Sequence, residues 1–311
     1  MTTQTPLSIK KVKSMKNVMP RQQAPFSWHA YLMILPSLSV FLIFYIIPIF
    51  YLIFLSFHDW DLVNPVKQWI GLGNYFELLQ DADFLQVLQN TFVYTLLTVS
   101  LLIILSLLTS LWLNQNDIFT RFVQGAIFSP YIISLVSVAL LWLWMMDPQY
   151  GLLNAILTWF GLPPYPWLDS PDTALYALVL VSVWQGLGYN TLVFIAGLNS
   201  IPTDLYEAAA LDDTPPWKTF FRITLPMLSP TLFFLVIIDL IASFKVFETI
   251  AIMTGGGPLN STNMLVYYIY QYGFRFYKIG YASAAAVILL IILSILTWLY
   301  FALLEKRVHY R

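Results

Sequence analysis

Six long apolar runs dominate this chain, and their length decides which solvent it must fold in. A helix rises about 1.5 Å per residue, so roughly 20 apolar residues cross a hydrocarbon layer about 30 Å thick. The runs lie at residues 30–56, 91–113, 125–146, 174–198, 227–250 and 282–304. Only 10% of the residues are charged, whereas a soluble domain has about 25%. We therefore expect an all-α membrane protein with six transmembrane helices.

The composition also limits the chemistry that the chain can carry. It contains no cysteine, which excludes disulfides, thiolate metal sites and cysteine-ligated iron–sulfur clusters. The three histidines, His29, His58 and His309, are too far apart in sequence to suggest a metal cluster or a catalytic pair. A formal net charge of −1 gives no bulk attraction to nucleic acid. We therefore expect no catalytic residue and no metal site.

Basic residues are distributed unequally between the two predicted sides of the membrane. An even number of spans places both termini on one side, and cytoplasmic loops carry an excess of Lys and Arg. With cytoplasmic termini, 11 basic residues lie inside, and Lys67, Arg275 and Lys278 lie outside. The inside group is Lys10, Lys11, Lys13, Lys16, Arg21, Arg121, Lys218, Arg222, Lys306, Arg307 and Arg311. This predicts a multi-pass protein of the cell (inner or plasma) membrane with both termini cytoplasmic.

The predicted organisation is one membrane domain with short polar ends. Residues 1–29 form a basic, cytoplasmic N-terminal segment, residues 30–304 the six-helix transmembrane domain, and residues 305–311 a cytoplasmic tail. The first apolar run is longer than the core of a signal peptide, so we expect it to be retained as a membrane anchor.

The loop between the fourth and fifth runs, residues 199–226, has the features of ordered structure. Thr203 is a good N-cap residue and predicts a short, alanine-rich helix that ends near Leu211. Thr214 can cap a second helix with Pro215 at its first position, where the missing N–H costs nothing. The loop is predicted to form two helices whose small side chains allow another protein to approach closely. An ordinary connecting loop is the alternative interpretation.

This loop resembles the EAA loop of ABC-importer permeases, which docks into the cytoplasmic ATPase. The matching loop residues are Glu207, Ala208, Ala209, Asp212, Asp213, Leu225 and Pro226. Residues 254–258, 261–262 and 280–284 are similar to the fifth-to-sixth-helix region of the carbohydrate-uptake branch, which includes the maltose and glycerol-3-phosphate permeases. The chain departs from the family at Asp213, where glycine is usual. Asp adopts left-handed turn conformations less freely than Gly does.

The resemblance implies a function and a set of partners. It implies the six-transmembrane-helix ABC-importer permease fold with cytoplasmic coupling helices, in a subunit that is not an enzyme. Such a permease pairs with a second homologous permease and two ATPase subunits, and an extracytoplasmic solute-binding protein delivers its substrate. ATP and Mg are then expected on the partner ATPase, and no cofactor on this chain. The sequence agrees, because the glycines at 255–257 are followed by Pro258 and no Gly-Lys-Ser or Gly-Lys-Thr of a P-loop is present.

Polar residues share one helical face in each of two runs. The fourth run carries Ser182, Gln185, Gly186 and Tyr189 at positions i, i+3, i+4 and i+7. The fifth run carries Asp239 and Ser243 at i and i+4. Such faces turn away from lipid, and an intramembrane carboxylate is a candidate functional group. The alternative is that these polar groups only satisfy one another between helices.

Two further charges in the fifth run have a structural explanation. Lys245 and Glu248 are three residues apart on the predicted helix, so they can form an ion pair. Asp239 lies six residues before Lys245 and points to another side of the helix, so it has no obvious local partner. We therefore single out Asp239, and not the pair, as a candidate for function.

The resemblance to maltose-type permeases implies a substrate site on these faces. It places the sugar-lining positions of the family on Tyr131, Ser182, Gln185, Gly186, Tyr189, Asp239 and Ser243. Leu135 stands where the maltose permease has a polar residue, so a different substrate or pose is expected. A carboxylate, an amide and two tyrosine faces suit sugar hydroxyls and rings. Because Asp239 would repel a phosphate, a neutral sugar or a glycosylated polyol is favoured.

Other functions stay open at the level of sequence. A glycerol-3-phosphate ABC permease is the alternative within the same family. An ion-coupled secondary transporter or a channel also has several membrane helices with a few acids, but it leaves the loop at 199–226 unexplained. A membrane enzyme needs a catalytic dyad or a set of metal ligands within the runs, and none is evident.

Overall fold

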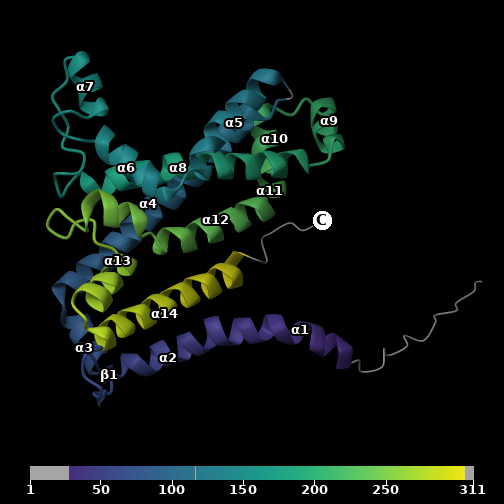
Figure 1. Cartoon of the computed structure of the whole chain (residues 1–311). Coiled ribbons are helices and arrows are strands. Elements are labelled where there is room, and N and C mark those ends of the chain that lie inside the picture. Colours follow the sequence, from purple (N-terminus) through teal and green to yellow (C-terminus); the bar gives the residue numbers. More distant parts are fainter. Residues whose placement is uncertain (1–27, 116, 305–311) are drawn as a thin grey trace, which may run out of the picture. The chain divides into compact units, whose positions relative to one another are not determined.

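The computed structural model describes residues 28–115 and 117–304, which form helices, short connections and one two-stranded sheet (Figure 1). The tail predicted at 305–311, and all but the last two residues of the segment predicted at 1–29, lie outside the described residues. The chain divides into two compact units, residues 1–49 and 50–311. The first unit contains α1 (Trp28–Phe41) and the π-helical turn η1 (Leu42–Ile46), and α2 (Ile47–Ser56) begins at its end.

Long apolar helices dominate the described chain. Four are long and apolar enough to cross a membrane: Leu32–Ser56, α4 (Ala82–Leu113), α8 (Ala174–Asn199) and α14 (Ile279–Leu304). Two more candidate spans are bent: α5 (Ile118–Ile132) meets α6 (Leu135–Met145) at 100°, and Pro216–Met227 meets α12 (Ser229–Phe244) at 64°. The described residues thus contain four to six spans. The helical membrane class is therefore confirmed. The predicted number of six spans is reached only if each bent pair crosses the membrane as one span.

Residues 125–146 and residues 227–250 each contain a break in the helix. In the first stretch α5 ends at Ile132, and Pro130 removes a backbone donor from its last turn. In the second stretch α12 ends at Phe244, and residues 245–247 form a turn and irregular chain before helix resumes. Apolar composition is compatible with either a straight or a broken span, so the runs alone do not show these breaks.

Close packing of α4, α5, α8 and α12 forms the centre of the second unit. In Figure 1, α8 and α12 run side by side, and they also contact each other. Gly188 allows α8 to approach α5, because a Cβ at this position would overlap the backbone carbonyl of Ile127. Tyr94 and Leu178 are almost fully buried in the core between α4 and α8. These contacts position the polar faces of the helices against one another.

The loop at 199–226 is helical for most of its length. It contains α9 (Thr203–Leu211), α10 (Pro216–Thr219), η2 (Phe220–Thr224) and α11 (Leu225–Met227). The first helix has the bounds expected from the sequence, but both expected caps are displaced by one residue. Pro202 precedes α9 and Pro215 precedes α10, each with extended backbone and no capping side chain. Proline favours this conformation because its ring fixes φ near −65°.

Smaller elements lie between the candidate spans along the chain. They are β1 (His58–Asp59), β2 (Gln68–Trp69), α3 (Gly73–Gln80), α7 (Leu152–Trp159), η3 (Ile250–Thr254), α13 (Leu265–Tyr270) and η4 (Gln271–Arg275). The strands pair antiparallel, with His58 opposite Trp69. Figure 1 shows α7 at one end of α8 and α9 at the other.

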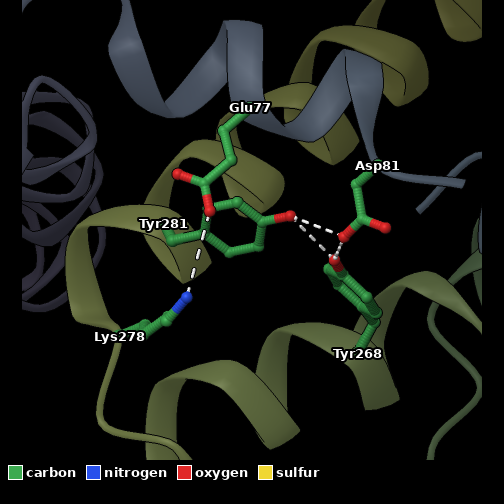
Figure 2. A network of polar contacts seen from close by, with 5 residues as sticks. All are labelled: Glu77, Asp81, Tyr268, Lys278 and Tyr281. Carbon is green, nitrogen blue, oxygen red and sulfur yellow. Dashed lines mark hydrogen bonds and ion pairs between the residues drawn. The ribbon is translucent and has the colours of Figure 1, made fainter. Parts of the chain in front are cut away.

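A polar network joins the ends of α3 and α4 to α13 and α14 (Figure 2). Tyr268 and Tyr281 each donate a hydrogen bond of 2.9 Å to Asp81 Oδ2. Beside them, Lys278 Nζ lies 3.9 Å from Glu77 Oε1. Burial raises the pKa of Asp81, but the hydrogen bonds from Tyr281, Tyr268 and the backbone N–H groups of Asp83 and Phe84 together outweigh this effect, so the pKa is lowered overall. The network therefore stabilises the charged form of Asp81.

Candidate functional site

A cavity of about 240 Å³ lies in the second unit, between α4, α5, α8, α12 and the segment that follows α12. All residues predicted for the substrate site line it: Tyr131, Ser182, Gln185, Gly186, Tyr189, Asp239 and Ser243. Leu135, at the start of α6, lines it as well. The fold thus brings together side chains from three apolar runs that are far apart in sequence. Their role in binding stays a prediction.

Asp239 is buried in the cavity wall and has a partner on another helix. Asn190 Nδ2, from α8, donates a hydrogen bond of 2.8 Å to Asp239 Oδ2. Asn190 is fully buried, and its own Oδ1 has no hydrogen-bond partner among the described residues. Asp239 lacks a partner on its own helix, as expected, but the carboxylate is not isolated. Asn190 lies eight residues after Ser182, a spacing that places it on the predicted polar face of α8. This spacing is the sequence signal by which Asn190 could have been included in the predicted site.

The hydroxyl and aromatic groups of the site are partly engaged with one another. Ser182 Oγ lies 2.6 Å from the hydroxyl of Tyr94, a residue of α4 that the sequence did not single out. Tyr131 and Tyr189 stack, with ring centroids 4.7 Å apart and planes 16° from parallel. One face of each ring is therefore covered by the other ring. In these two contacts the groups of the site pair with each other between helices, as the alternative interpretation of the polar faces expects.

Other lining groups keep their hydrogen-bonding capacity. Gln185 and Ser243 make no side-chain hydrogen bond within residues 28–115 and 117–304. Gly186 lies on the predicted polar face, and the Leu102 side chain packs over it. A Cβ on Gly186 would lie 3.1 Å from Leu102 Cδ2. Glycine at this position therefore allows α4 to approach α8, and it leaves an apolar patch beside the amide of Gln185.

The expected ion pair between Lys245 and Glu248 does not form. Among the described residues, the ion pair that is found within 4.0 Å joins Lys278 to Glu77, and it involves neither Lys245 nor Glu248. The reason is the end of α12 at Phe244, because the i, i+3 spacing brings side chains together only on a continuous helix. Lys245 and Glu248 instead both line the cavity. The broken span thus adds a cation and an anion that the sequence interpretation had assigned to structure.

The predicted coupling residues lie on α9 and the turns that follow it. Glu207 and Ala208 are exposed, whereas Ala209 is 7% exposed and packs within this chain. Asp213 has a φ of 49°, in the left-handed region that glycine adopts most freely. Its position in the turn between α9 and α10 explains why glycine suits this site. The other predicted positions, Asp212, Leu225 and Pro226, are exposed or half-buried in the same region.

No set of metal ligands is assembled in the part of the chain that the structure describes. Within these residues, no three His, Cys, Asp or Glu side chains come together in a way that could hold a metal ion. The residues that line the cavity offer hydrogen bonds, charge and aromatic surface to a ligand.

Comparison with known proteins identifies the family. The model of the "Binding-protein-dependent transport system inner membrane component" family matches residues 24–310. This chain belongs to that family. It is a multi-pass permease component of an ABC importer, as the loop and its neighbouring motifs predict, and the family is a transport component and not an enzyme class.

Individual relatives are similar over nearly the whole chain. The sn-glycerol-3-phosphate transport system permease protein UgpA of Yersinia pestis bv. Antiqua (strain Antiqua) is 34% identical over 92% of this chain and 97% of its own. The probable ABC transporter permease protein YurN of Bacillus subtilis (strain 168) is 37% identical over 84% and 91%. A permease in the crystal structure of a bacterial alginate ABC transporter, bound to a periplasmic protein that holds an alginate pentasaccharide, superimposes with a TM-score of 0.77, 26% identity and coverage of 88% and 92%.

Proposed function

We propose that the cavity is the substrate site of this importer and that it passes a neutral sugar or a glycosylated polyol. The carrying observation is the convergence of a carboxylate, an amide, hydroxyls and two tyrosine rings from four helices on one cavity. Ligand sites commonly combine apolar walls with a few convergent polar groups, as this one does. The names of its relatives, which include glycerol-3-phosphate and alginate transporters, support a substrate of the sugar type.

Each group has a definite contribution to such a site. Asn190 engages Asp239 Oδ2, so Oδ1 can accept a hydrogen bond from a substrate hydroxyl. Gln185 can both donate and accept. Tyr131 and Tyr189 contribute aromatic surface to the cavity, and Leu102 and Leu135 contribute apolar surface. A molecule with several hydroxyls on an apolar ring matches this mixture.

A second candidate is an anionic substrate, and two observations favour it. Lys245 lines the cavity, and the relatives include a permease named for glycerol 3-phosphate and one from a transporter of the acidic polysaccharide alginate. Two carboxylates, those of Asp239 and Glu248, line the same cavity and outnumber this single cation. Like charges close together are unfavourable, particularly where water is limited. We therefore place the neutral substrate first.

The assembly that we propose follows the family. This permease pairs with a second homologous permease and two ATPase subunits, which bind ATP and Mg, and an extracytoplasmic solute-binding protein delivers the substrate. Both termini are cytoplasmic, so α9 faces the ATPase. The exposed Ala208, Leu211 and Trp217 support this docking role, since Leu211 is 87% exposed and Trp217 is 62% exposed. Large apolar side chains at that degree of exposure mark contact surfaces.

Reconstitution of the complete importer tests the proposal. Proteoliposomes with the binding protein and ATP are supplied with radiolabelled maltose, glucosylglycerol, sn-glycerol 3-phosphate or an alginate trisaccharide. We expect uptake of a neutral probe that requires ATP and the binding protein. Uptake driven by an ion gradient without ATP would instead indicate a secondary transporter. Asp239→Asn and Gln185→Ala should lower uptake, and unchanged uptake in both variants would contradict the site.

A further inference from the structure

Two buried threonine hydroxyls in the cavity wall have no hydrogen-bond partner. Thr98, on α4, is 4% exposed, and Thr249, just after the break in the fifth span, is 2% exposed; both line the cavity. Neither Oγ1 atom has a hydrogen-bond partner among the described residues. Tyr94 lies within interaction range of Thr98, but its hydrogen bond of 2.6 Å joins it to Ser182. Buried hydroxyls are normally paired, because an unpaired one loses its bonds to water.

Other threonines in these helices show how such groups are ordinarily satisfied. Thr91 and Thr191 each donate a hydrogen bond of 2.7 Å to the carbonyl four residues earlier. For Thr249 that position is Lys245, which lies where the helix is interrupted. Thr98 has a helical carbonyl at the same spacing and does not use it. Both hydroxyls therefore keep unused hydrogen-bonding capacity in residues that line the cavity.

We propose that Thr98 and Thr249 are specificity-determining residues that bind hydroxyl groups of the transported molecule. The inference rests on the proposed function and adds two walls, one from α4 and one from the segment after α12, to the residues predicted from the sequence. Each hydroxyl can donate one hydrogen bond and accept others. Two such groups on different helices select a polyhydroxylated compound over an apolar molecule of the same size, since the apolar molecule would leave both hydroxyls unpaired.

Thr95 provides a matched control on the same helix. It is 6% exposed, and its Oγ1 has no hydrogen-bond partner among the described residues, yet it does not line the cavity. Valine preserves the branched shape of threonine and removes the hydroxyl. If all three hydroxyls were merely unpaired groups in the protein interior, the three valine variants would behave alike.

The test uses the complete importer in proteoliposomes with its binding protein, and the same four probes: maltose, glucosylglycerol, sn-glycerol 3-phosphate and an alginate trisaccharide. For each probe that the wild type takes up, Thr98→Val and Thr249→Val should lower the initial rate about two- to tenfold, the loss expected for one neutral hydrogen bond. Thr95→Val should retain the wild-type rate. Thr98→Ser, which keeps the hydroxyl, should recover most of the rate that Thr98→Val loses.

The outcomes separate this inference from the proposed function. Wild-type uptake in Thr98→Val and Thr249→Val, with uptake lost in Asp239→Asn and Gln185→Ala, would overturn the inference and leave the site in place. Unchanged uptake in all four variants would overturn the site itself. An equal loss in Thr95→Val would overturn the inference, because packing would then explain the effect. Uptake of no probe by the wild type would remove the polyhydroxylated class. Copurification of each variant with the other subunits of the importer checks that the complex assembles. Where a valine variant does not assemble, the corresponding alanine variant is used in its place.

Discussion

Asn190 and Asp239 join α8 to α12 at the wall of the cavity, through a hydrogen bond of 2.8 Å between Nδ2 and Oδ2. The bond fixes one carboxylate oxygen and leaves the other free, so it orients Asp239 and does not consume it. Asn190 is fully buried, whereas Asp239 retains 8% exposure. The same contact that joins the two helices thus also orients the Asp239 carboxylate, which is predicted to bind the substrate.

The first prediction concerns this pair. Asn190→Ala removes the donor and leaves a buried carboxylate oxygen unpaired, which should cost about 1–3 kcal/mol of stability and also lower transport. Asp239→Asn removes the charge and keeps the size of the side chain. Because the two residues are in contact, the effects of Asn190→Ala and Asp239→Asn on the thermal midpoint should not add in the double variant. Additive effects, measured on purified complex, would show that the two side chains act independently.

Coupling to the ATPase is tested best at Ala208. Ala209 is buried within this chain, so a bulky residue there would disturb α9 itself. Ala208 is exposed on the same helix, and Ala208→Arg should keep the permease inserted but lower both uptake and substrate-stimulated ATP hydrolysis at least about tenfold, the equivalent of 1.4 kcal/mol or more. Ala208→Ser keeps the side chain small and serves as the control. Wild-type activities in Ala208→Arg would exclude this face of α9 from the docking surface.

Asp213 provides a prediction about backbone conformation. Its φ of 49° is favourable for glycine and strained for most other residues. Asp213→Gly should therefore be tolerated in assembly and transport. A β-branched residue at the same position, in Asp213→Val, should cost about 1–2 kcal/mol by the same steric argument. If Asp213→Gly fails to copurify with the ATPase, the carboxylate makes a contact in the complex that this chain alone does not contain.

The sequence predicts the membrane class and part of the cavity lining for simple physical reasons. Long apolar runs indicate that the helices lie in lipid, and the spacing of Ser182, Gln185 and Tyr189 indicates that they share one helical face. These signals are local and do not depend on how the helices are packed. The family resemblance adds Tyr131, whose place beside Tyr189 depends on the close approach of α5 and α8.

What the sequence misses depends on three-dimensional packing. The break after Phe244 converts Lys245 and Glu248 from a possible ion pair into two separate residues of the cavity wall. Leu102 fills the space over Gly186, a contact between helices that no spacing within one run can reveal. Thr98 belongs to a run without any charge, and only the position of its hydroxyl in the folded chain distinguishes it from a core threonine.

The network of Asp81, Tyr268 and Tyr281 predicts a pH dependence of stability. The pKa of Asp81 is lowered in the folded chain from its ordinary value of 3.8. A lowered carboxyl pKa stabilises the fold above pH 3.8, and this stabilisation is lost as the pH falls through the lower, folded-state value. Asp81→Asn should therefore flatten the decline of the thermal midpoint between about pH 5 and pH 2. Asp83→Asn is the control and should keep the decline, because Asp83 contacts Asp81 through its backbone N–H and the substitution leaves that hydrogen bond in place.

Lys245 distinguishes the neutral substrate from the anionic one. It lines the cavity together with Asp239 and Glu248, and no ion pair within 4.0 Å engages it among the described residues. If it binds an anionic group of the substrate, Lys245→Gln removes a charge-assisted hydrogen bond of about 1.5–3 kcal/mol, which corresponds to a loss of about tenfold or more in uptake. If the substrate is neutral, glutamine still donates a hydrogen bond, and the loss should stay below about threefold. We expect the smaller loss, measured in proteoliposomes with each of the four probes, neutral and anionic, that the wild type takes up. Lys278→Gln, which removes a cation outside the cavity, is the matched control, and a tenfold loss in Lys245→Gln alone would reverse the order of the two candidate substrates.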